Sequence, residues 1–212
     1  MSKYGRGFLW TIGILAALVL GLRAFVLDVW TIPEDPVLSA SIAPTLTGGD
    51  VVLVLTRGTP GFGELVRCPD PEDPQHFVVG RIAGLEGDTV ETEGGSLLVN
   101  GKRYDGETVC KSPKISVRDP SSGNEVQIPC DVVSMGGGWH YRAHGGRPFK
   151  VVHTRTDVGG DMVFLLSDDR EYHDDSRDFG VITRAVCKQR ILFRLWSKAG
   201  WSDDENRMDY IH

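Results

Sequence analysis

The segments "HFVVGRIAGLEGDTVETE" (residues 76–93) and "SLLVNGK" (residues 96–102) carry the pattern that decides the fold. Both are rich in β-branched and other apolar residues, which is typical of short strands. The "VNG" that precedes Lys102 is the signal of a tight turn between antiparallel strands. We therefore predict that this part of the chain lies in an antiparallel β-sheet.

Similar apolar runs occur on both sides of this stretch, whereas the pattern of an amphipathic helix is absent beyond the N-terminal segment. Many short strands without intervening helices indicate a mainly β body. The further runs are residues 51–57, 150–155, 162–167 and 179–196.

Residues 101–157 differ, because they hold most of the loop-like composition. We expect an inserted subdomain here, between two parts of the β body, residues 31–100 and 158–212. His140 and His144 stand four residues apart in a glycine-rich stretch of this insertion. A metal site is one alternative there, but solvent-exposed side chains are the expectation, and we predict no metal and no cofactor.

The four cysteines give one predicted disulfide. Cys110 and Cys130 bracket a polar loop, and a bridge between them would close a segment that has little else to hold it. Cys187 lies in an apolar strand and is predicted to be a buried free thiol. No pattern assigns a partner to Cys68, and the spacings do not match a zinc site.

The composition is that of a globular protein. The 212 residues are 25% charged and 41% hydrophobic, which argues against wholesale disorder. The net charge is −6, and the sequence has no cluster of basic residues of the kind that binds nucleic acid. We therefore do not predict a nucleic-acid-binding protein.

The N-terminal segment predicts a membrane anchor. Residues 1–7 carry two basic residues and no acid, and the apolar run that follows is long enough to span if residues 8–30 are counted with Arg23 at one interface. The positive flank predicts a cytoplasmic N-terminus, with residues 31–212 on the extracytoplasmic side of the inner membrane. A cleaved signal peptide, processed near "SASIA", is the alternative.

Four segments in order carry a resemblance to a family. They are "SASIAPTL" (39–46), "GELVRC" (63–68), "VVGRIAGLEGDTVE" with "LLVNGK" (78–102), and "SDDREYHDDSRDFGVI" (167–182). Together, behind a predicted anchor, they resemble the bacterial type I signal peptidases, membrane-anchored serine proteases that remove signal peptides. The resemblance implies a signal-peptidase-like β-sheet body, secretory preproteins as substrates and contact with membrane lipid.

The resemblance assigns roles in the first motif. It implies that Ser41 is the nucleophile and that Ser39, together with Ser41, supplies the oxyanion hole. Pro44 and Thr45 match the Pro-Thr of the family, and Ile42 replaces its usual methionine. A serine hydroxyl needs a neighbouring base to take its proton, and the oxyanion needs donors placed where its charge develops.

The third of these segments lacks the residue that the family uses as that base. A lysine stands immediately before its arginine in the family, whereas Gly80 precedes Arg81 here. Glycine cannot accept a proton, and arginine stays protonated. Gly84, Gly87 and Asp88 still match the family pattern.

The fourth motif offers a replacement. It matches the family at Asp168, Arg170, Asp175, Ser176 and Arg177, but His173 stands where the family has a serine that contacts the catalytic lysine. We therefore hypothesise that His173 is the base for Ser41 and that Asp175 orients it, in a Ser–His–Asp arrangement.

The leading prediction is thus a membrane-bound serine endopeptidase of signal peptidase I type. The alternative is a catalytically inactive relative, a pseudoprotease that binds preproteins or a partner signal peptidase. A membrane-tethered β module with a structural role is a third class.

Overall fold

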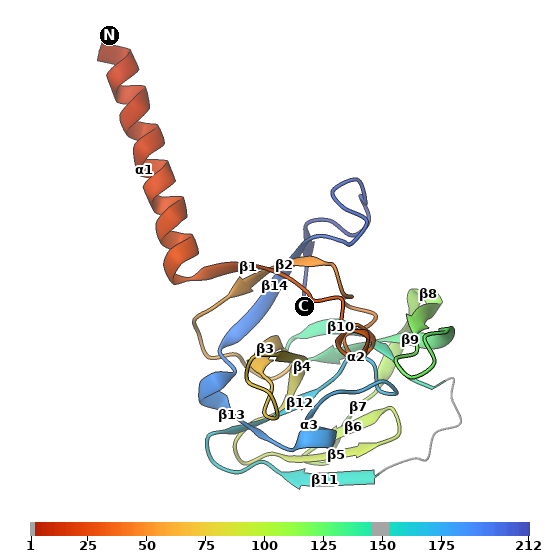
Figure 1. The fold of residues 1–212 in the computed structure, drawn as a ribbon. Helices are drawn as coiled ribbons and strands as arrows, with labels where there is room; N and C mark the ends of the chain where they lie inside the picture. Colours follow the sequence, from red (N-terminus) through yellow and green to blue (C-terminus); the bar gives the residue numbers. More distant parts are fainter. Residues whose placement is uncertain (1–2, 146–152) are drawn as a thin grey trace.

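The computed structural model describes residues 3–145 and 153–212 (Figure 1). Residues 1–2 of the predicted cytoplasmic tail and residues 146–152 of the predicted insertion lie outside this part. The side chains of Lys3, Arg6 and Arg23, on which the predicted topology depends, also lie outside it.

An antiparallel sheet of eight strands forms the centre of the body, so the predicted mainly β fold is confirmed. Its order is β1-β2-β14-β3-β4-β12-β13, with β15 paired to β14. The strands are β1 (Leu27–Thr31), β2 (Val51–Leu55), β3 (Leu65–Pro69), β4 (Phe77–Gly84), β12 (Met162–Leu166), β13 (Ile182–Thr183), β14 (Gln189–Trp196) and β15 (Asp209–Tyr210).

The predicted hairpin belongs to a second sheet. Val99 of β6 pairs with Lys102 of β7, and the turn residues between them, Asn100 and Gly101, have positive φ angles of 51° and 77°, as a tight hairpin turn requires. The sheet has the order β11-β5-β6-β7. Its strands are β5 (Thr89–Glu93), β6 (Ser96–Val99), β7 (Lys102–Tyr104) and β11 (His153–Asp157).

A third, three-stranded sheet lies within the predicted insertion. It comprises β8 (Gly106–Arg118), β9 (Glu125–Met135) and β10 (Gly138–Ala143), in the order β10-β9-β8. A parallel bridge joins Ala143, at the end of β10, to Asp169 in the fourth motif. The small sheet is therefore attached to the segment that follows β12 as well as to its own neighbours in sequence.

Three helices and one 3₁₀ turn complete the described elements. The helix α1 (Lys3–Phe25) projects from the body (Figure 1), and α2 (Pro36–Ser41), α3 (Ser176–Phe179) and the 3₁₀ turn η1 (Arg184–Val186) are short. Asp35 caps α2 by accepting a hydrogen bond from Leu38 N at 2.8 Å, and Pro36 suits the first turn. These residues fix where α2 begins, and Ser41 is its last residue.

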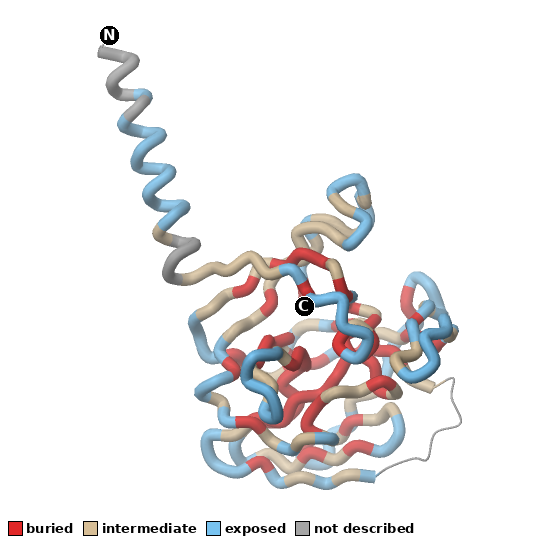
Figure 2. Tube along the Cα trace, viewed as in Figure 1, coloured by how far each residue is buried: buried red, intermediate tan, exposed pale blue. Residues whose placement is uncertain are grey.

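The strand β4 lies at the centre of the core (Figure 2). Val79 packs in a cluster with Leu38 and Ile42 of the α2 segment, whereas Val78 packs in another with Leu165. Neighbours on both faces explain why the strand reads as a nearly continuous apolar run. Gly80 and Arg81 are consequently placed in the interior.

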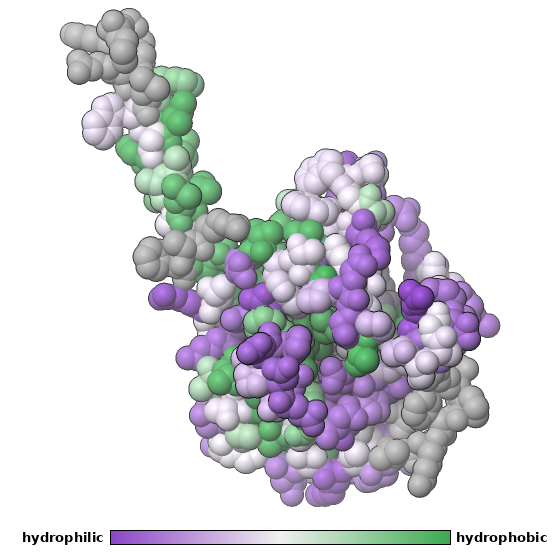
Figure 3. Space-filling model, in the orientation of Figure 1, coloured by the Kyte–Doolittle hydropathy of each residue, from purple (hydrophilic) through white to green (hydrophobic). Residues whose placement is uncertain are grey.

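Apart from Thr11, the side chains of α1 that the structure describes are apolar, and residues 8 and 10–20 are exposed. Phe8, Trp10 and Leu20 are among them, and Figure 3 shows hydrophobic side chains along the projecting helix. Within the described residues, no helix combines the length and the apolar character of a membrane span. The predicted anchor is therefore not confirmed.

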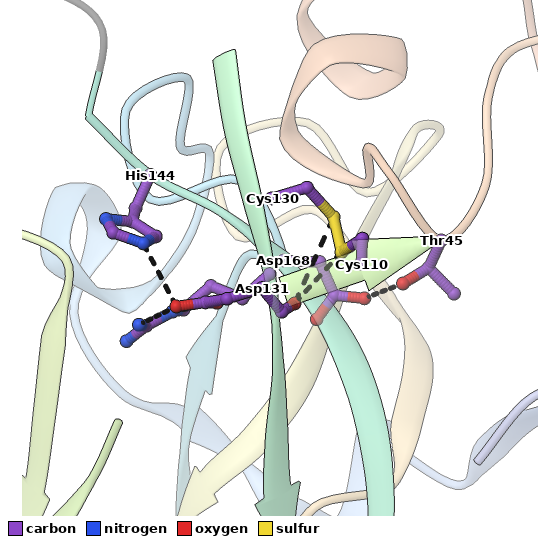
Figure 4. Close-up of a disulfide and its surroundings, with 7 residues drawn as sticks. Thr45, Cys110, Cys130, Asp131, His144 and Asp168 are labelled. Atoms are coloured by element: carbon purple, nitrogen blue, oxygen red, sulfur yellow. Dashed lines mark hydrogen bonds and ion pairs between the residues drawn. A yellow bond between two sulfur atoms is a disulfide. The ribbon is translucent and has the colours of Figure 1, made fainter. Parts of the chain in front are cut away.

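Two disulfides are present. The predicted Cys110–Cys130 bridge is confirmed (Figure 4). The prediction that Cys187 is a free thiol was wrong, because Cys187 is bonded to Cys68 with their Cα atoms 4.7 Å apart. Pairing of β14 with β3, through Gln189 and Arg67, brings the two cysteines together across 119 residues of sequence.

Candidate active site

Ser41 is fully buried at the end of α2. Its Oγ donates a hydrogen bond to the carbonyl of Leu38 at 3.0 Å, and its own carbonyl accepts one from Asp169 N at 3.0 Å. The second bond places the fourth motif directly against the nucleophile segment. Ser39 Oγ accepts a hydrogen bond from Gly48 N at 3.1 Å, and this hydroxyl can still donate its own proton.

Gly80 lies in the middle of β4, opposite Val66 of β3. A Cβ atom added there would lie 3.3 Å from Leu165 Cβ and 3.4 Å from the main-chain N and O of Leu166. Any larger residue at this position therefore requires β12 to move by a few tenths of an ångström.

Asp168 connects three of the motifs. Its carboxylate accepts hydrogen bonds from Arg81 Nε at 2.7 Å and Nη2 at 3.1 Å. It also accepts one from Thr45 Oγ1 at 2.5 Å, which Figure 4 shows. The Arg81 and Asp168 side chains are almost completely buried. A planar two-point contact of this kind fixes orientation as well as distance. The structure thus brings together Thr45, Arg81 and Asp168, which the sequence assigned from separate motifs.

Asp175 and Arg177 form a second buried ion pair. Arg177 Nη2 lies 2.7 Å from Asp175 Oδ2, and the same carboxylate caps α3 and accepts a hydrogen bond from Ser167 N at 2.8 Å. Burial raises the pKa of Asp175, but the Arg177 guanidinium and the backbone N–H groups outweigh burial and hold this pKa at about 2. Asp175 therefore stays ionised.

His173 pairs with a different carboxylate from the one the sequence suggested. Its Nδ1 lies 2.7 Å from Asp178 Oδ2. Asp175 is within 4.8 Å of the same group but is occupied by Arg177 and by the cap of α3. A carboxylate that accepts the Nδ1 proton leaves Nε2 as the acceptor of a neutral ring. Asp178, not Asp175, is thus placed to orient His173.

The loop that carries His173 packs against α2. The neighbouring Tyr172 is buried in one cluster with Ala40 and Ala43, which flank Ser41. No direct hydrogen bond between His173 and Ser41 is among those of the described residues. Ser41 Oγ would therefore have to leave the Leu38 carbonyl before it could bond to the imidazole.

Asp169 is a buried carboxylate that the sequence did not single out. Its Oδ1 accepts hydrogen bonds from Glu171 N at 2.8 Å and Tyr172 N at 3.1 Å, whereas Oδ2 has no partner among the described residues. Burial is the main cause that raises its pKa to about 7. The carboxyl next to the nucleophile segment thus changes protonation near neutral pH.

A buried layer from the third sheet lies behind Asp168. His140 Nε2 is 3.9 Å from Asp168 Oδ1, and burial, with the nearby charges of Arg81, Arg170 and Arg142, lowers the pKa of His140 well below its usual value. The expectation of a solvent-exposed His140 was wrong, because this residue lies in β10 and faces the interior.

His144 makes a separate contact from His140. Its Nε2 lies 3.0 Å from Asp131 Oδ2, a carboxylate that also accepts from Arg142 Nε at 2.8 Å (Figure 4). The two histidines therefore have different partners, and the alternative of a shared metal site receives no support from these contacts. The alternation of polar and apolar residues in "WHYRA" is the sequence signal that could have placed His140 and Arg142 on one buried face.

One group of potential metal ligands occurs in the described part of the chain, His173 with Asp175 and Asp178. Asp175 is paired with Arg177, and Asp178 bonds both His173 Nδ1 and the backbone N–H of Asp175. These contacts suit the orientation of an imidazole better than the binding of a cation.

The sequence matches a known protein family. The family model described as "Signal peptidase, peptidase S26" matches residues 6–196. A signal peptidase I from Leptolyngbya laminosa is 26% identical over 198 residues, covering 88% of this chain and 77% of the relative. One from Pseudomonas aeruginosa is 30% identical over 198 residues, covering 84% and 62%.

A solved structure of a signal peptidase I from Enterococcus faecalis V583 is 22% identical, with a TM-score of 0.40, and covers 64% of this chain and 98% of its own. The match of the family model over most of the sequence decides the assignment. This chain belongs to the signal peptidase family, peptidase S26.

Proposed function

We propose that this protein is a membrane-bound serine endopeptidase that removes signal peptides from secretory preproteins, with Ser41 as the nucleophile. The observation that carries the proposal is the Thr45–Asp168–Arg81 contact, which joins three motifs of the family beside Ser41. Membership of the family supports preproteins as the substrate class.

In the proposed reaction, Ser41 Oγ leaves the Leu38 carbonyl, gives its proton to His173 Nε2 and attacks the carbonyl carbon of the scissile bond. Asp178 holds the imidazolium that forms. The Ser39 hydroxyl and the backbone N–H of Ser41 stabilise the tetrahedral oxyanion. The leaving amine takes the proton from His173 as the C–N bond breaks, and water then hydrolyses the acyl-enzyme by the same route.

We further propose that α1 anchors the protein in the inner membrane, with the body on the extracytoplasmic side. The exposed apolar side chains of α1 support contact with lipid. The two disulfides support an oxidising compartment, because such bonds are rare in the cytoplasm.

The second candidate is an inactive relative that binds preproteins or a partner signal peptidase. Two observations favour it: Gly80 has no side chain to act as a base, and Ser41 Oγ is bonded to a main-chain carbonyl. Incubation of the purified full chain, in detergent micelles, with a preprotein decides between the two candidates. Cleavage by the wild type and none by Ser41→Ala supports the peptidase, whereas no cleavage and no labelling by a serine-directed acylating probe supports the inactive relative.

A further inference from the structure

Residues 211–212 reach the buried ion pair of the candidate site from far along the sequence. Arg81 Nη1 donates hydrogen bonds to the main-chain oxygen of His212 and to the carbonyl of Gly63, the latter at 3.0 Å. Nε and Nη2 of the same guanidinium bind the Asp168 carboxylate. His212 therefore contacts the one guanidinium nitrogen that Asp168 does not bind.

The Arg81 guanidinium depends on these acceptors because it has almost no contact with water. Arg81 is 1% exposed. A guanidinium carries five N–H groups, and a buried N–H that loses its acceptor is costly, since water does not replace the lost hydrogen bond. The main-chain oxygen of His212 thus satisfies one of these groups and helps to keep the guanidinium aligned with Asp168.

Strand pairing brings the segment to this position. β15 pairs with β14 through Tyr210 and Phe193, and Ile211 N bonds to Leu192 O at 2.9 Å. The main chain is therefore held against β14 up to the residue that precedes His212.

Ile211 packs in the same apolar cluster as the nucleophile segment. It is 4% exposed, and the cluster includes Leu38 and Ile42, which lie on either side of Ser41 in the sequence. The segment that holds Arg81 is consequently anchored beside α2 as well as beside β14.

Two aromatic rings enclose the imidazole of His212. The imidazole stacks on Trp139 of β10 with ring centroids 4.7 Å apart, and it meets the Tyr210 ring edge-on at 4.9 Å. Contacts between aromatic rings in these orientations are favourable. The side chain of His212 therefore ties the segment to the third sheet and helps to hold its main-chain oxygen against Arg81.

We propose that His212 is a positioning residue of the peptidase and acts through its main-chain oxygen. This oxygen holds the guanidinium of Arg81, which in turn orients Asp168. Asp168 accepts the hydrogen bond of Thr45, four residues after Ser41. The inference rests on the proposed function, because the reaction that this chain of contacts supports is the cleavage of preproteins.

Arginine side-chain NMR tests the contact without any need for activity. The wild type is compared in detergent micelles with a form that lacks residue 212. We expect the side-chain N–H protons of Arg81 to exchange with water at least about tenfold faster in that form, because a buried N–H loses its acceptor. Arg177, which is paired with Asp175, is the internal control. Equal exchange at Arg81 in the two proteins overturns the proposal.

Cleavage kinetics test the role in the reaction. We expect the form that lacks residue 212 to cleave a purified preprotein with kcat lowered about ten- to hundredfold and KM nearly unchanged, because misplacement of the reacting groups lowers kcat. Val90→Ala is the control for a general loss of stability, since it opens a cavity in a separate core cluster. An unchanged kcat in the form without residue 212, or an equal loss in Val90→Ala, contradicts the proposal.

His212→Ala separates the main-chain oxygen from the imidazole. This variant keeps the oxygen and loses the contact with Trp139, so we expect kcat and the exchange at Arg81 to lie between those of the other two proteins. An equal loss of kcat in both altered proteins would assign the effect to the imidazole and overturn the role of the oxygen. Should the form without residue 212 fail to fold, unchanged exchange at Arg81 in His212→Ala overturns the proposal.

The two measurements keep this inference separate from the proposed function. Faster exchange at Arg81, with no cleavage of the preprotein by the wild type, would reject the peptidase while the hold of His212 on Arg81 stands. Cleavage by the wild type, with exchange at Arg81 unchanged on removal of residue 212, would keep the peptidase and reject the positioning role.

Discussion

At the scale of single residues, Gly80 and His173 are the two departures that decide the chemistry. We predict that His173→Ala lowers the rate of preprotein cleavage by about 10²–10⁴-fold, the usual cost of a lost base, with folding unchanged. The wild-type rate should fall in acid, because only a neutral imidazole accepts the seryl proton. Full activity of His173→Ala, measured on a purified preprotein, excludes His173 as the base.

The family base can also be restored. We expect the double variant Gly80→Lys with His173→Ser to cleave with a more alkaline optimum than the wild type, because an amine then takes the proton. Gly80→Ala with His173→Ser is the matched control, since it introduces the same crowding against Leu165 and Leu166 without an amine. Equal activity of the two double variants over the pH range would show that the lysine plays no part.

The Asp169 carboxyl predicts a pH dependence of stability. Its folded-state pKa of about 7 lies above the ordinary value of 3.8. The folded state therefore keeps a proton that the unfolded chain has released, and the free energy of unfolding falls as the pH rises through this window. Asp169→Asn removes the energetic cost of ionising a buried carboxyl. We therefore expect this variant to be more stable than the wild type above pH 7 by up to a few kcal/mol, since one pKa unit equals about 1.4 kcal/mol.

Denaturant unfolding at pH 4 and pH 8 measures this effect. The gain from Asp169→Asn should be present at pH 8 and absent at pH 4, and the same gain at both would refute the assignment. Asp175→Asn is the contrasting control. The folded pKa of Asp175 is depressed to about 2, so this variant should be destabilised at pH 8, with the loss fading as the pH falls toward 2.

How far the sequence predicts such details differs between residues. Arg81, Asp168, Asp175 and Arg177 lie in recognisable motifs, and the structure pairs them as two buried ion pairs. The pairing of His173 with Asp178 could not be predicted, because it depends on how the four-residue helix α3 is capped. The roles of these residues in catalysis stay predictions.

At the scale of elements, the disulfide between β3 and the segment before β14 fixes a long-range strand contact. The apolar pattern predicted a strand that runs through Cys187, which was wrong, because Cys187 follows the 3₁₀ turn η1 and β14 begins only at Gln189. The pattern also could not predict the neighbour of this segment, since pairing of strands distant in sequence leaves no local signal. By contrast, the pattern predicted the hairpin of β6 and β7 from its turn residues, Asn100 and Gly101, which are a local signal.

We predict that loss of the two disulfides has unequal consequences. A disulfide stabilises the folded state by lowering the conformational entropy of the unfolded chain, and more so when the closed loop is longer. The 119-residue separation of Cys68 and Cys187 corresponds to a stabilisation of about 5 kcal/mol, and the 20-residue separation of Cys110 and Cys130 to about 3 kcal/mol. Cys68→Ala with Cys187→Ala should therefore lower the free energy of unfolding more than Cys110→Ala with Cys130→Ala. Denaturant unfolding of the two double variants measures the difference, and the reverse order would contradict the prediction.

At the scale of the whole molecule, α1 projects from a body built of three sheets (Figure 1). We predict that the full chain floats with lipid vesicles in a density gradient and that a form without residues 3–25 does not, because the apolar side chains of α1 are exposed. A reporter fused after residue 212, active only in the cytoplasm, should stay silent. Flotation of the shortened form would contradict the proposed anchoring. An active reporter would contradict the proposed orientation.

The bridge between Ala143 and Asp169 limits how the chain could be re-engineered. Ala143 N bonds to Asp168 O at 3.0 Å, and Arg170 N bonds to Ala143 O at 2.8 Å. A designer who excised the small sheet to obtain a minimal domain would strip two main-chain partners from the loop that carries Asp168. We therefore expect such a deletion to disturb the loop that carries Asp168. A foreign hairpin in place of the small sheet would have to supply a strand end that makes the same two main-chain hydrogen bonds as Ala143.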